Sequence, residues 1–342
     1  MQRLYTLDYL RGLAATGIMC YHFSLWYFGA FNAGDFLGRV GVYGVVLFYV
    51  LSGLTLYLVY HKRMKPTAKD LRDFGLRRIF RILPLLWLVN LLSIWVGEKS
   101  VDATKLFLNF TGLFGFFTWD SYIATGAWSI GNELVFYVFF PIFIGLLRFQ
   151  RKAFYLLSLA ILGVYLYFTF GVLQPAVPVA KQWFHYTQPL NQLFYFLAGF
   201  WIGWLFENRV ITARQAFLLL LTGMLLLVFI PAQGDYIVLV TGYNRLAFAL
   251  AMVMLCVGVY KWPMKLDRVS HGILTFLGEV SYSVYLIHPI IYTALGRMQR
   301  EWFWFPEYVR FILAFPLTLG ISYVVYRFYE QYFIRKAKAL TP

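Results

Sequence analysis

Charged residues are scarce in this chain. Lys, Arg, Asp and Glu make up only 13% of its 342 residues, while hydrophobic residues make up 61%. About a quarter of the residues of a soluble domain are charged, so this chain lacks the polar side chains that cover a surface in water. Apolar runs of about 20 residues, long enough to cross a bilayer core, recur along it. The composition excludes an ordinary soluble domain and predicts an all-α integral membrane protein.

Cysteine and acidic residues are also few. The two cysteines, Cys20 and Cys256, fall inside apolar runs and offer neither a disulfide framework nor the spacing of a metal site. The 15 acidic residues stand against 30 basic ones, which gives a net charge of +15. The basic residues lie in short segments between apolar runs rather than on one soluble face. We therefore expect no metal and no nucleic-acid partner.

Ten apolar runs predict about ten transmembrane helices. A further segment, 106–118, is apolar but short and is interrupted by Gly112 and Gly115, which is typical of a re-entrant or interfacial segment. No internal repeat or long polar stretch divides the chain, so residues 1–342 are expected to form one domain. The predicted helices span residues 6–28, 39–60, 82–97, 127–147, 153–172, 188–206, 213–231, 243–260, 272–295 and 307–330.

The distribution of Lys and Arg predicts the orientation. If the N-terminus is cytoplasmic, segments on the cytoplasmic side carry 22 of the 30 basic residues, from Arg3 onward, with eight of them in 62–81. Basic residues in short loops favour the cytoplasmic side of a membrane. Both ends of the chain are therefore expected in the cytoplasm, with an even number of spans between them.

Ionisable side chains inside a span are costly in lipid and therefore informative. Arg11 and His22 of the first span are eleven residues apart, close to three helical turns, so both lie on one face. Asp8 precedes Arg11 by one turn and is placed to pair with it. Two explanations fit: a polar path that leads from the cytoplasmic boundary into the membrane, or charges that anchor the helix end while His22 bonds a carbonyl.

Arg78 and Arg81 are three residues apart at the end of the most basic segment, 61–81, which is expected to be a loop before the third span. The planar guanidinium fork suits phosphate oxygens. Contact with anionic lipid explains the lysines of this segment well. It explains Arg81 less well, because Arg81 directly precedes the apolar residues 82–84.

Two further spans carry polar residues. Glu133 lies near the start of the fourth span with no basic residue nearby in sequence, so it needs a partner from another helix or a wet cavity. Ser281, Tyr285 and His288 of the ninth span share one helical face. Their hydroxyl and imidazole groups suit a sugar-like ligand, and they suit hydrogen bonds between helices equally well.

Together and in this order, these segments resemble the membrane-bound acyltransferase-3 family, which acylates carbohydrates and other hydroxylated molecules at bacterial membranes. The resemblance covers nearly the whole chain. It depends on the Leu-Asp-x-x-Arg-Gly opening, the pair of Arg11 and His22, Phe-Tyr-Val-Leu-Ser-Gly at 48–53, Arg78-x-x-Arg81 followed by Pro84, Trp-Ser-x-x-x-Glu-x-x-x-Tyr at 128–137, and Ser-Tyr-Ser-x-Tyr-Leu-x-His at 281–288.

The chain departs from the family pattern in three places. The family often has an Asp before the aromatic pair of the second span, where this chain reads Gly-Val-Val-Leu at 44–47. Near the C-terminus it usually has Glu-Arg-Pro, where this chain reads Glu-Gln-Tyr at 330–332. Many members carry a fused extracytoplasmic hydrolase-like domain, and this chain is expected to be a stand-alone member without one.

The resemblance implies an O-acyltransferase of the bacterial inner (plasma) membrane. The implied donor is a cytoplasmic acyl-CoA, with acetyl-CoA expected, and the implied acceptor is a hydroxyl of a carbohydrate or lipid-linked glycan. No cofactor is expected to stay bound, and the oligomeric state is left open. The alternative is a proton-coupled secondary transporter or flippase, which also places ionisable residues in its spans. Against it, the sequence lacks the matching Gly- or Pro-interrupted segments of inverted repeats.

The resemblance also implies roles for single residues. Arg78 and Arg81 would hold the phosphates of the donor, with Arg11 helping. His22 is the expected general base because imidazole titrates near neutral pH, and Glu133 is expected to orient it. The expected acceptor or oxyanion contacts are Trp128, Ser129, Ser281, Tyr285 and His288.

Overall fold

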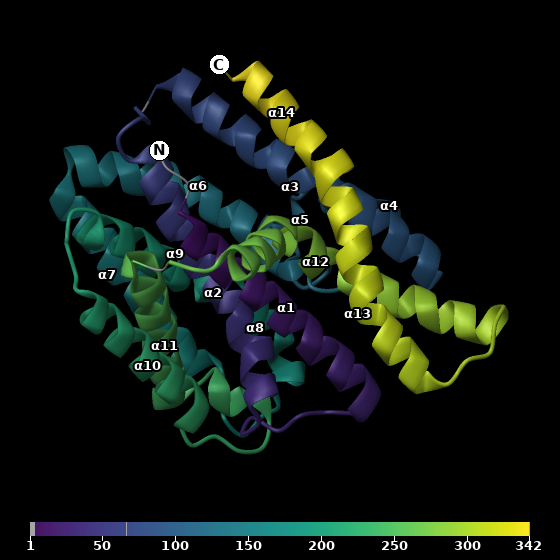
Figure 1. The fold of residues 1–342 in the computed structure, drawn as a ribbon. Helices are drawn as coiled ribbons and strands as arrows, with labels where there is room; N and C mark the ends of the chain where they lie inside the picture. Colours follow the sequence, from purple (N-terminus) through teal and green to yellow (C-terminus); the bar gives the residue numbers. More distant parts are fainter. Residues whose placement is uncertain (1–3, 66, 264, 342) are drawn as a thin grey trace.

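The chain is helical throughout. The computed structural model describes residues 4–65, 67–263 and 265–341, and these ranges contain helices and turns but no strand (Figure 1). Each of the ten apolar runs falls on a helix, so the all-α prediction is confirmed. The long helices are α1 (Tyr5–Phe28), α2 (Phe36–Tyr60), α3 (Ala68–Gly97), α6 (Trp128–Phe149), α7 (Arg151–Tyr167), α9 (Pro189–Phe206), α10 (Ala213–Phe229), α11 (Gly242–Lys261), α12 (Arg268–Glu301) and α13 (Glu307–Val324).

Shorter elements join or extend these helices. π-helical turns continue α7 and α13, and the second of them leads directly into α14, so that α13 and α14 form one long helical segment. The shorter elements are α4 (Ala103–Thr111), α5 (Phe114–Phe117), α8 (Trp183–Thr187), α14 (Gln331–Leu340), the π turns Phe168–Val172 and Val325–Glu330, and the 3₁₀ turns Val179–Gln182 and Tyr236–Leu239.

Seven helical segments of the described chain are long and apolar enough to cross a membrane. α1 and α9 are not among them, and α10 is apolar but has only 17 residues. The chain is therefore a multi-pass membrane protein, while the number of ten spans stays a prediction. The seven segments are Phe36–Tyr60, Ala68–Gly97, Trp128–Phe149, Arg151–Val172, Gly242–Lys261, Arg268–Glu301 and Glu307–Leu340.

The prediction of a basic loop before the third span is wrong, because α3 begins well before residue 82. Thr67 caps the helix: its side-chain oxygen accepts a hydrogen bond of 3.1 Å from the backbone N–H of Asp70. The cap starts the helix before five of the eight basic residues of 62–81, so most of the segment that was expected to be a loop is helical. Arg78 and Arg81 are therefore presented from a rigid helix.

The segment 106–118 is interrupted, as the sequence predicts. It forms α4 and α5, which are separated at Gly112. Gly112 has a φ of +77°, a left-handed conformation that glycine adopts without strain. Neither helix is long enough to span a bilayer. The location of the segment 106–118 within the membrane or at its surface stays a prediction.

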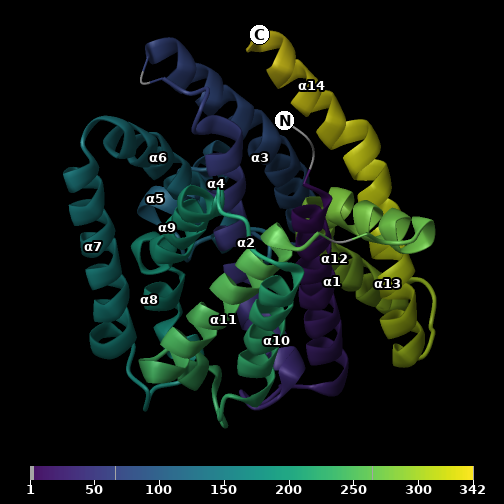
Figure 2. The same cartoon turned by 60° about the vertical axis from the view of Figure 1, so that its left-hand side comes forward.

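α1 lies inside the bundle, where it packs against both α2 and α12 (Figure 2). α2 also packs on α9, and α10 packs on α11. α14 runs along the first half of α3, and Arg77 of α3 donates a hydrogen bond of 2.7 Å to the hydroxyl oxygen of Thr341. The start of α1 and the end of α14 lie toward the same end of the bundle (Figures 1 and 2).

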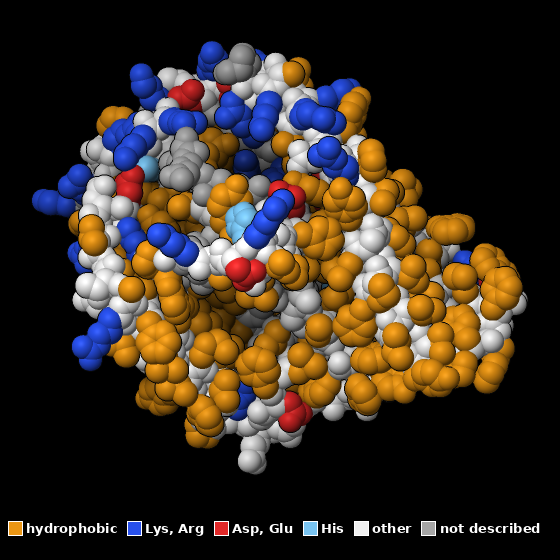
Figure 3. Space-filling view, in the orientation of Figure 1, with side chains coloured by type: hydrophobic (Ala, Val, Ile, Leu, Met, Phe, Trp, Pro, Cys, Tyr) orange, Lys and Arg blue, Asp and Glu red, His pale blue; other side chains and the backbone are white. Residues whose placement is uncertain are grey.

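Lys and Arg side chains gather at that same end, in the upper part of Figure 3, while hydrophobic side chains cover most of the remaining face. A basic end beside an apolar belt is typical of the cytoplasmic side of a membrane protein. The orientation with both ends in the cytoplasm stays a prediction. Arg3, one of the basic residues on which it depends, lies outside the described residues.

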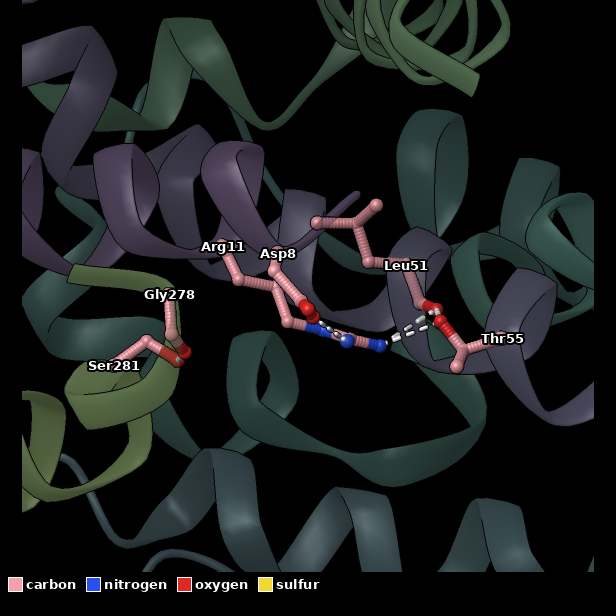
Figure 4. Close-up of polar contacts among 6 residues, drawn as sticks. All are labelled: Asp8, Arg11, Leu51, Thr55, Gly278 and Ser281. Carbon is pink, nitrogen blue, oxygen red and sulfur yellow. Dashed lines mark hydrogen bonds and ion pairs between the residues drawn. The ribbon is translucent and has the colours of Figure 1, made fainter. Parts of the chain in front are cut away.

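α1 and α12 approach each other closely at Gly12 and Gly278. A Cβ atom added at Gly12 would lie 2.6 Å from the backbone nitrogen of Gly278, and one added at Gly278 would lie 2.5 Å from the carbonyl oxygen of Asp8. Backbone atoms cannot give way as a flexible side chain can, so any larger residue would push the helices apart. The contact brings Asp8 and Arg11 close to Ser281 on the next turn of α12 (Figure 4).

We predict that Gly278→Ala separates α1 from α12 and lowers the unfolding temperature in detergent micelles, because overpacking a tight contact costs about 1–3 kcal/mol. Gly272→Ala is the matched control on the same helix, since nothing lies within 4 Å of a Cβ added there. That control should be neutral or slightly stabilising, because alanine favours a helix by about 0.5–1 kcal/mol over glycine. An unchanged unfolding temperature for Gly278→Ala would contradict the contact.

Candidate active site

A polar cavity of about 390 Å³ lies between α1, α2, α3, α6 and α12. Figure 3 shows a hollow at the basic end of the molecule, among Lys and Arg side chains. Seven of the ten predicted site residues line the cavity, although they come from four separate helices. These seven are Arg11, Arg78, Arg81, Ser129, Glu133, Ser281 and Tyr285.

Arg11 lines the cavity but is held by other parts of the protein (Figure 4). Its Nη1 lies 3.3 Å from a carboxylate oxygen of Asp8, as the sequence predicts. Its Nη2 donates to the hydroxyl oxygen of Thr55 at 2.5 Å and to the carbonyl oxygen of Leu51 at 3.4 Å. Arg11 therefore connects α1 to α2, and most of its hydrogen-bonding capacity is already used.

Ser281 also has a partner within the protein: its hydroxyl donates to the carbonyl oxygen of Gly278 at 2.8 Å.

Arg78 lies in an aromatic cage. Its guanidinium carbon lies 5.8 Å from the ring centroids of Tyr60 and Tyr137 and 5.9 Å from that of Phe74. These distances are those of cation–π contacts. One Nη donates weakly to the hydroxyl of Tyr60 at 3.5 Å, and the buried Nε has no hydrogen-bond partner among the described residues. The cage holds the charge in place without neutralising it.

Arg81 is the most available of the three arginines. Its side chain is exposed to the cavity and makes no hydrogen bond or salt bridge with any described residue. Glu330, one of the carboxylates that act on it electrostatically, is buried and accepts a hydrogen bond from the hydroxyl of Ser283. Arg78 and Arg81 thus line one cavity and form no salt bridge with any carboxylate in the described part of the chain, an arrangement that suits an anionic ligand.

Glu133 does not pair with His22, contrary to the expectation from the sequence. Its Oε1 accepts hydrogen bonds from the hydroxyl of Ser52 at 2.7 Å and from that of Tyr137 at 2.5 Å. The first comes from α2 and the second from the next turn of α6. Two hydroxyl groups therefore donate to the Glu133 carboxylate inside the cavity, so it needs no imidazole partner.

His22 and His288 form a pair outside the cavity lining. Nε2 of His288 lies 3.0 Å from Nδ1 of His22. Trp26, one turn after His22, stacks on the His22 ring with their centroids 5.3 Å apart. His22 is half-buried, whereas His288 is almost fully buried. The expected base thus has an imidazole, rather than a carboxylate, as its partner.

Tyr285 is adjacent to both the cavity and the histidine pair. It lines the cavity, and its ring centroid lies 6.3 Å from that of His288. Its hydroxyl is 2.8 Å from that of Ser129 and donates to the carbonyl oxygen of Gly126 at 3.0 Å. Trp128 lies outside the cavity lining, where it packs against other aromatic rings such as Trp183.

Several cavity residues were not predicted as site residues. Ser52 and Tyr137 lie within two of the sequence patterns, so a signal for them existed. Tyr137 lies one turn from Glu133 on α6, so helical spacing could have predicted their contact, whereas the bond from Ser52 depends on the packing of α2 against α6. The cage residues Tyr60 and Phe74 carry no comparable signal. Aromatic residues are abundant in this sequence, and only the folded structure brings these two to Arg78.

The fold and the cavity define a multi-pass membrane protein with an inner cavity lined by arginine side chains. The chain matches the family model described as an acyltransferase domain over residues 4–327. It therefore belongs to the acyltransferase-3 family and is an acyltransferase.

Several relatives have names that agree with this family. A protein of Acidianus two-tailed virus, named "Putative acetyltransferase", is 29% identical over 313 residues, which cover 84% of this chain and 83% of the relative. Proteins of Staphylococcus aureus strains COL and MSSA476, each named "Putative O-acetyltransferase", are 25% identical over 366 aligned positions, which cover 98% of this chain. The chain spans 58% of the length of these staphylococcal relatives. No solved structure matches the chain.

We predict that Arg11→Met destabilises the protein by about 1.5–3 kcal/mol, because hydrogen bonds to charged groups contribute about this much and Arg11 joins two helices. Arg63→Met, at an exposed position of the same charge, should change stability by no more than about 0.5 kcal/mol. Denaturant unfolding in micelles measures both. Equal effects of the two substitutions would show that Arg11 does not hold α1 on α2.

Proposed function

We propose that the protein is a membrane-embedded O-acyltransferase that moves an acyl group from a cytoplasmic acyl-CoA to a hydroxyl of a carbohydrate or lipid-linked glycan. The expected acyl group is acetyl. The protein would lie in the inner (plasma) membrane, with the basic end on the cytoplasmic side. The names of the relatives support acetyl as the acyl group. The composition, rich in aromatic residues and poor in charged ones, supports a neutral or lipid-linked acceptor.

The observation that carries this proposal is the pair of arginines in one cavity, Arg78 and Arg81, that form no salt bridge with a carboxylate of the described residues. Coenzyme A carries several phosphate groups, and a guanidinium fork binds phosphate through charge-assisted hydrogen bonds. The phosphates would bind at the basic end, and the acyl-bearing arm would extend along the cavity towards Tyr285.

In the reaction, the acceptor hydroxyl oxygen attacks the carbonyl carbon of the thioester. A C–O bond forms and the C–S bond breaks. His22 takes the hydroxyl proton and returns it to the leaving sulfur, so coenzyme A leaves as a thiol. Negative charge develops on the carbonyl oxygen, and the hydroxyls of Ser129 and Tyr285, which both donate to the carbonyl oxygen of Gly126 in the structure, would turn towards it to stabilise it.

A transporter or flippase would use ionisable residues in its spans as well. Purified protein in liposomes, supplied with acetyl-CoA labelled in the acetyl group, separates the two functions. Label in covalent linkage to a glycan acceptor supports the transferase, whereas uptake of label into the liposomes without covalent transfer supports the transporter.

We predict that Arg81→Gln weakens the binding of coenzyme A at least about tenfold, because the loss of a charge-assisted hydrogen bond costs about 1.5–3 kcal/mol and 1.4 kcal/mol corresponds to a factor of ten. Isothermal titration of the purified protein with coenzyme A measures this. Arg335→Gln, which removes the same charge from an exposed position on α14, is the control and should bind normally. Equal binding by both variants would remove Arg81 from the donor site.

We predict that His22→Ala lowers acyl transfer by about 10²–10⁴-fold, the usual contribution of a general base. The measurement uses cells in which the gene is deleted and replaced by variants, and it determines the acetate that alkali releases from their envelope glycans. His185→Ala, at an exposed histidine outside the site, should restore the wild-type amount. Wild-type acetylation by His22→Ala would refute the assignment of the base.

A further inference from the structure

His22 and His288 belong to a chain of hydrogen bonds that ends on the backbone of α12. Nδ1 of His288 lies 2.9 Å from the carbonyl oxygen of Val284, and Nε2 of His288 lies 3.0 Å from Nδ1 of His22. The two rings are inclined by only 25°, with their centroids 5.0 Å apart. Both nitrogens of His288 are therefore engaged, whereas Nε2 of His22 makes no hydrogen bond with a described residue.

The backbone determines which nitrogen of His288 carries hydrogen. A carbonyl oxygen can only accept, so Nδ1 of His288 donates to Val284 and must be protonated. Pro289, the next residue, has no backbone N–H and leaves the carbonyl of Tyr285 without its usual helical partner. The carbonyl group of Val284 thus keeps hydrogen on Nδ1.

His288 is neutral in this environment. It is only 1% exposed, and its ring neighbours besides His22 are Phe23, Trp26 and Tyr285. No carboxylate among the described residues forms a hydrogen bond or an ion pair with it, and a buried charge without such a partner is costly. A neutral ring with hydrogen on Nδ1 has a lone pair on Nε2. That lone pair can only accept, so the hydrogen between the two histidines belongs to Nδ1 of His22.

We propose that His288 is a positioning residue that keeps His22 in the tautomer with hydrogen on Nδ1. The lone pair of His22 is then on Nε2, the nitrogen without a partner, where it can take the proton of an acceptor hydroxyl. Once Nε2 is protonated, the hydrogen bond from Nδ1 to His288 becomes charge-assisted and stabilises the imidazolium. This inference rests on the proposed acyl transfer with His22 as base. It gives His288 a role through His22 rather than the contact with acceptor expected from the sequence.

Two substitutions at residue 288 separate a hydrogen-bond acceptor from a space-filling side chain. His288→Gln carries an amide oxygen at about the place of Nε2 and can still accept from His22. His288→Leu fills similar space without a polar atom. We expect His288→Leu to lower envelope acetylation in complemented cells about 100-fold, the scale of a misplaced catalytic group, and His288→Gln to stay within about tenfold of wild type. Both purified variants should bind coenzyme A normally, which shows that they are folded.

A spectroscopic measurement reports the tautomer directly. Protein labelled with ¹⁵N in its histidine rings is compared with the same protein carrying His22→Gln, which identifies the His22 signals among the five histidines. We expect hydrogen on Nδ1 of His22 in the wild type and in His288→Gln, and its transfer to Nε2 in a large fraction of His288→Leu.

The outcomes are distinct. Hydrogen on Nε2 of His22 in the wild type, or full activity of His288→Leu, overturns the positioning role. Loss of activity in both variants with an unchanged tautomer also overturns it, because His288 would then be merely structural. If wild-type cells acetylate no glycan, the proposed function fails instead, and the tautomer measurement still decides whether the hydrogen-bond chain exists.

Discussion

The contact between α1 and α12 is the constraint on which the candidate site depends. At the basic end, Gly12 and Gly278 let the two backbones touch, and this places Arg11 on the wall of the cavity. Further along the same pair of helices, His22 meets His288. Arg11 and the histidine pair are thus positioned by the same two helices, so their separation is set by the rise of a helix rather than by a flexible loop.

The three arginines of the cavity differ in how much of their charge remains available. Arg11 is bound by Asp8 and by α2, Arg78 is surrounded by aromatic rings, and Arg81 has no hydrogen-bonding partner among the described residues. This gradation matters for a ligand that must bind and then leave. A structural arginine, a caged arginine and an available one give a cavity in which only part of the positive charge is free to contact a ligand.

The sequence predicts what is local and misses what depends on packing. Helical periodicity correctly places Arg11 one turn after Asp8, and apolar runs locate every long helix, because both follow from the geometry of one segment. The start of α3 was missed because the cap at Thr67 precedes a polar stretch that has no apolar run to mark it as helix. The partner of Glu133 was wrong because the contact of Ser52 depends on the packing of α2 against α6, and because the local spacing of Tyr137, one turn from Glu133, was not used.

The π turn at 325–330 constrains the number of residues between α13 and α14. It leads from α13 into α14 and places Glu330 where Ser283 donates to its carboxylate. A π turn holds one residue more than the α-helical path, and each residue of an α-helix corresponds to a rotation of about 100°. Deletion of a single residue here would therefore rotate α14 and take Thr341 away from Arg77. Over this segment the number of residues is more tightly constrained than their identity, and related chains should vary there by substitution rather than by insertion or deletion.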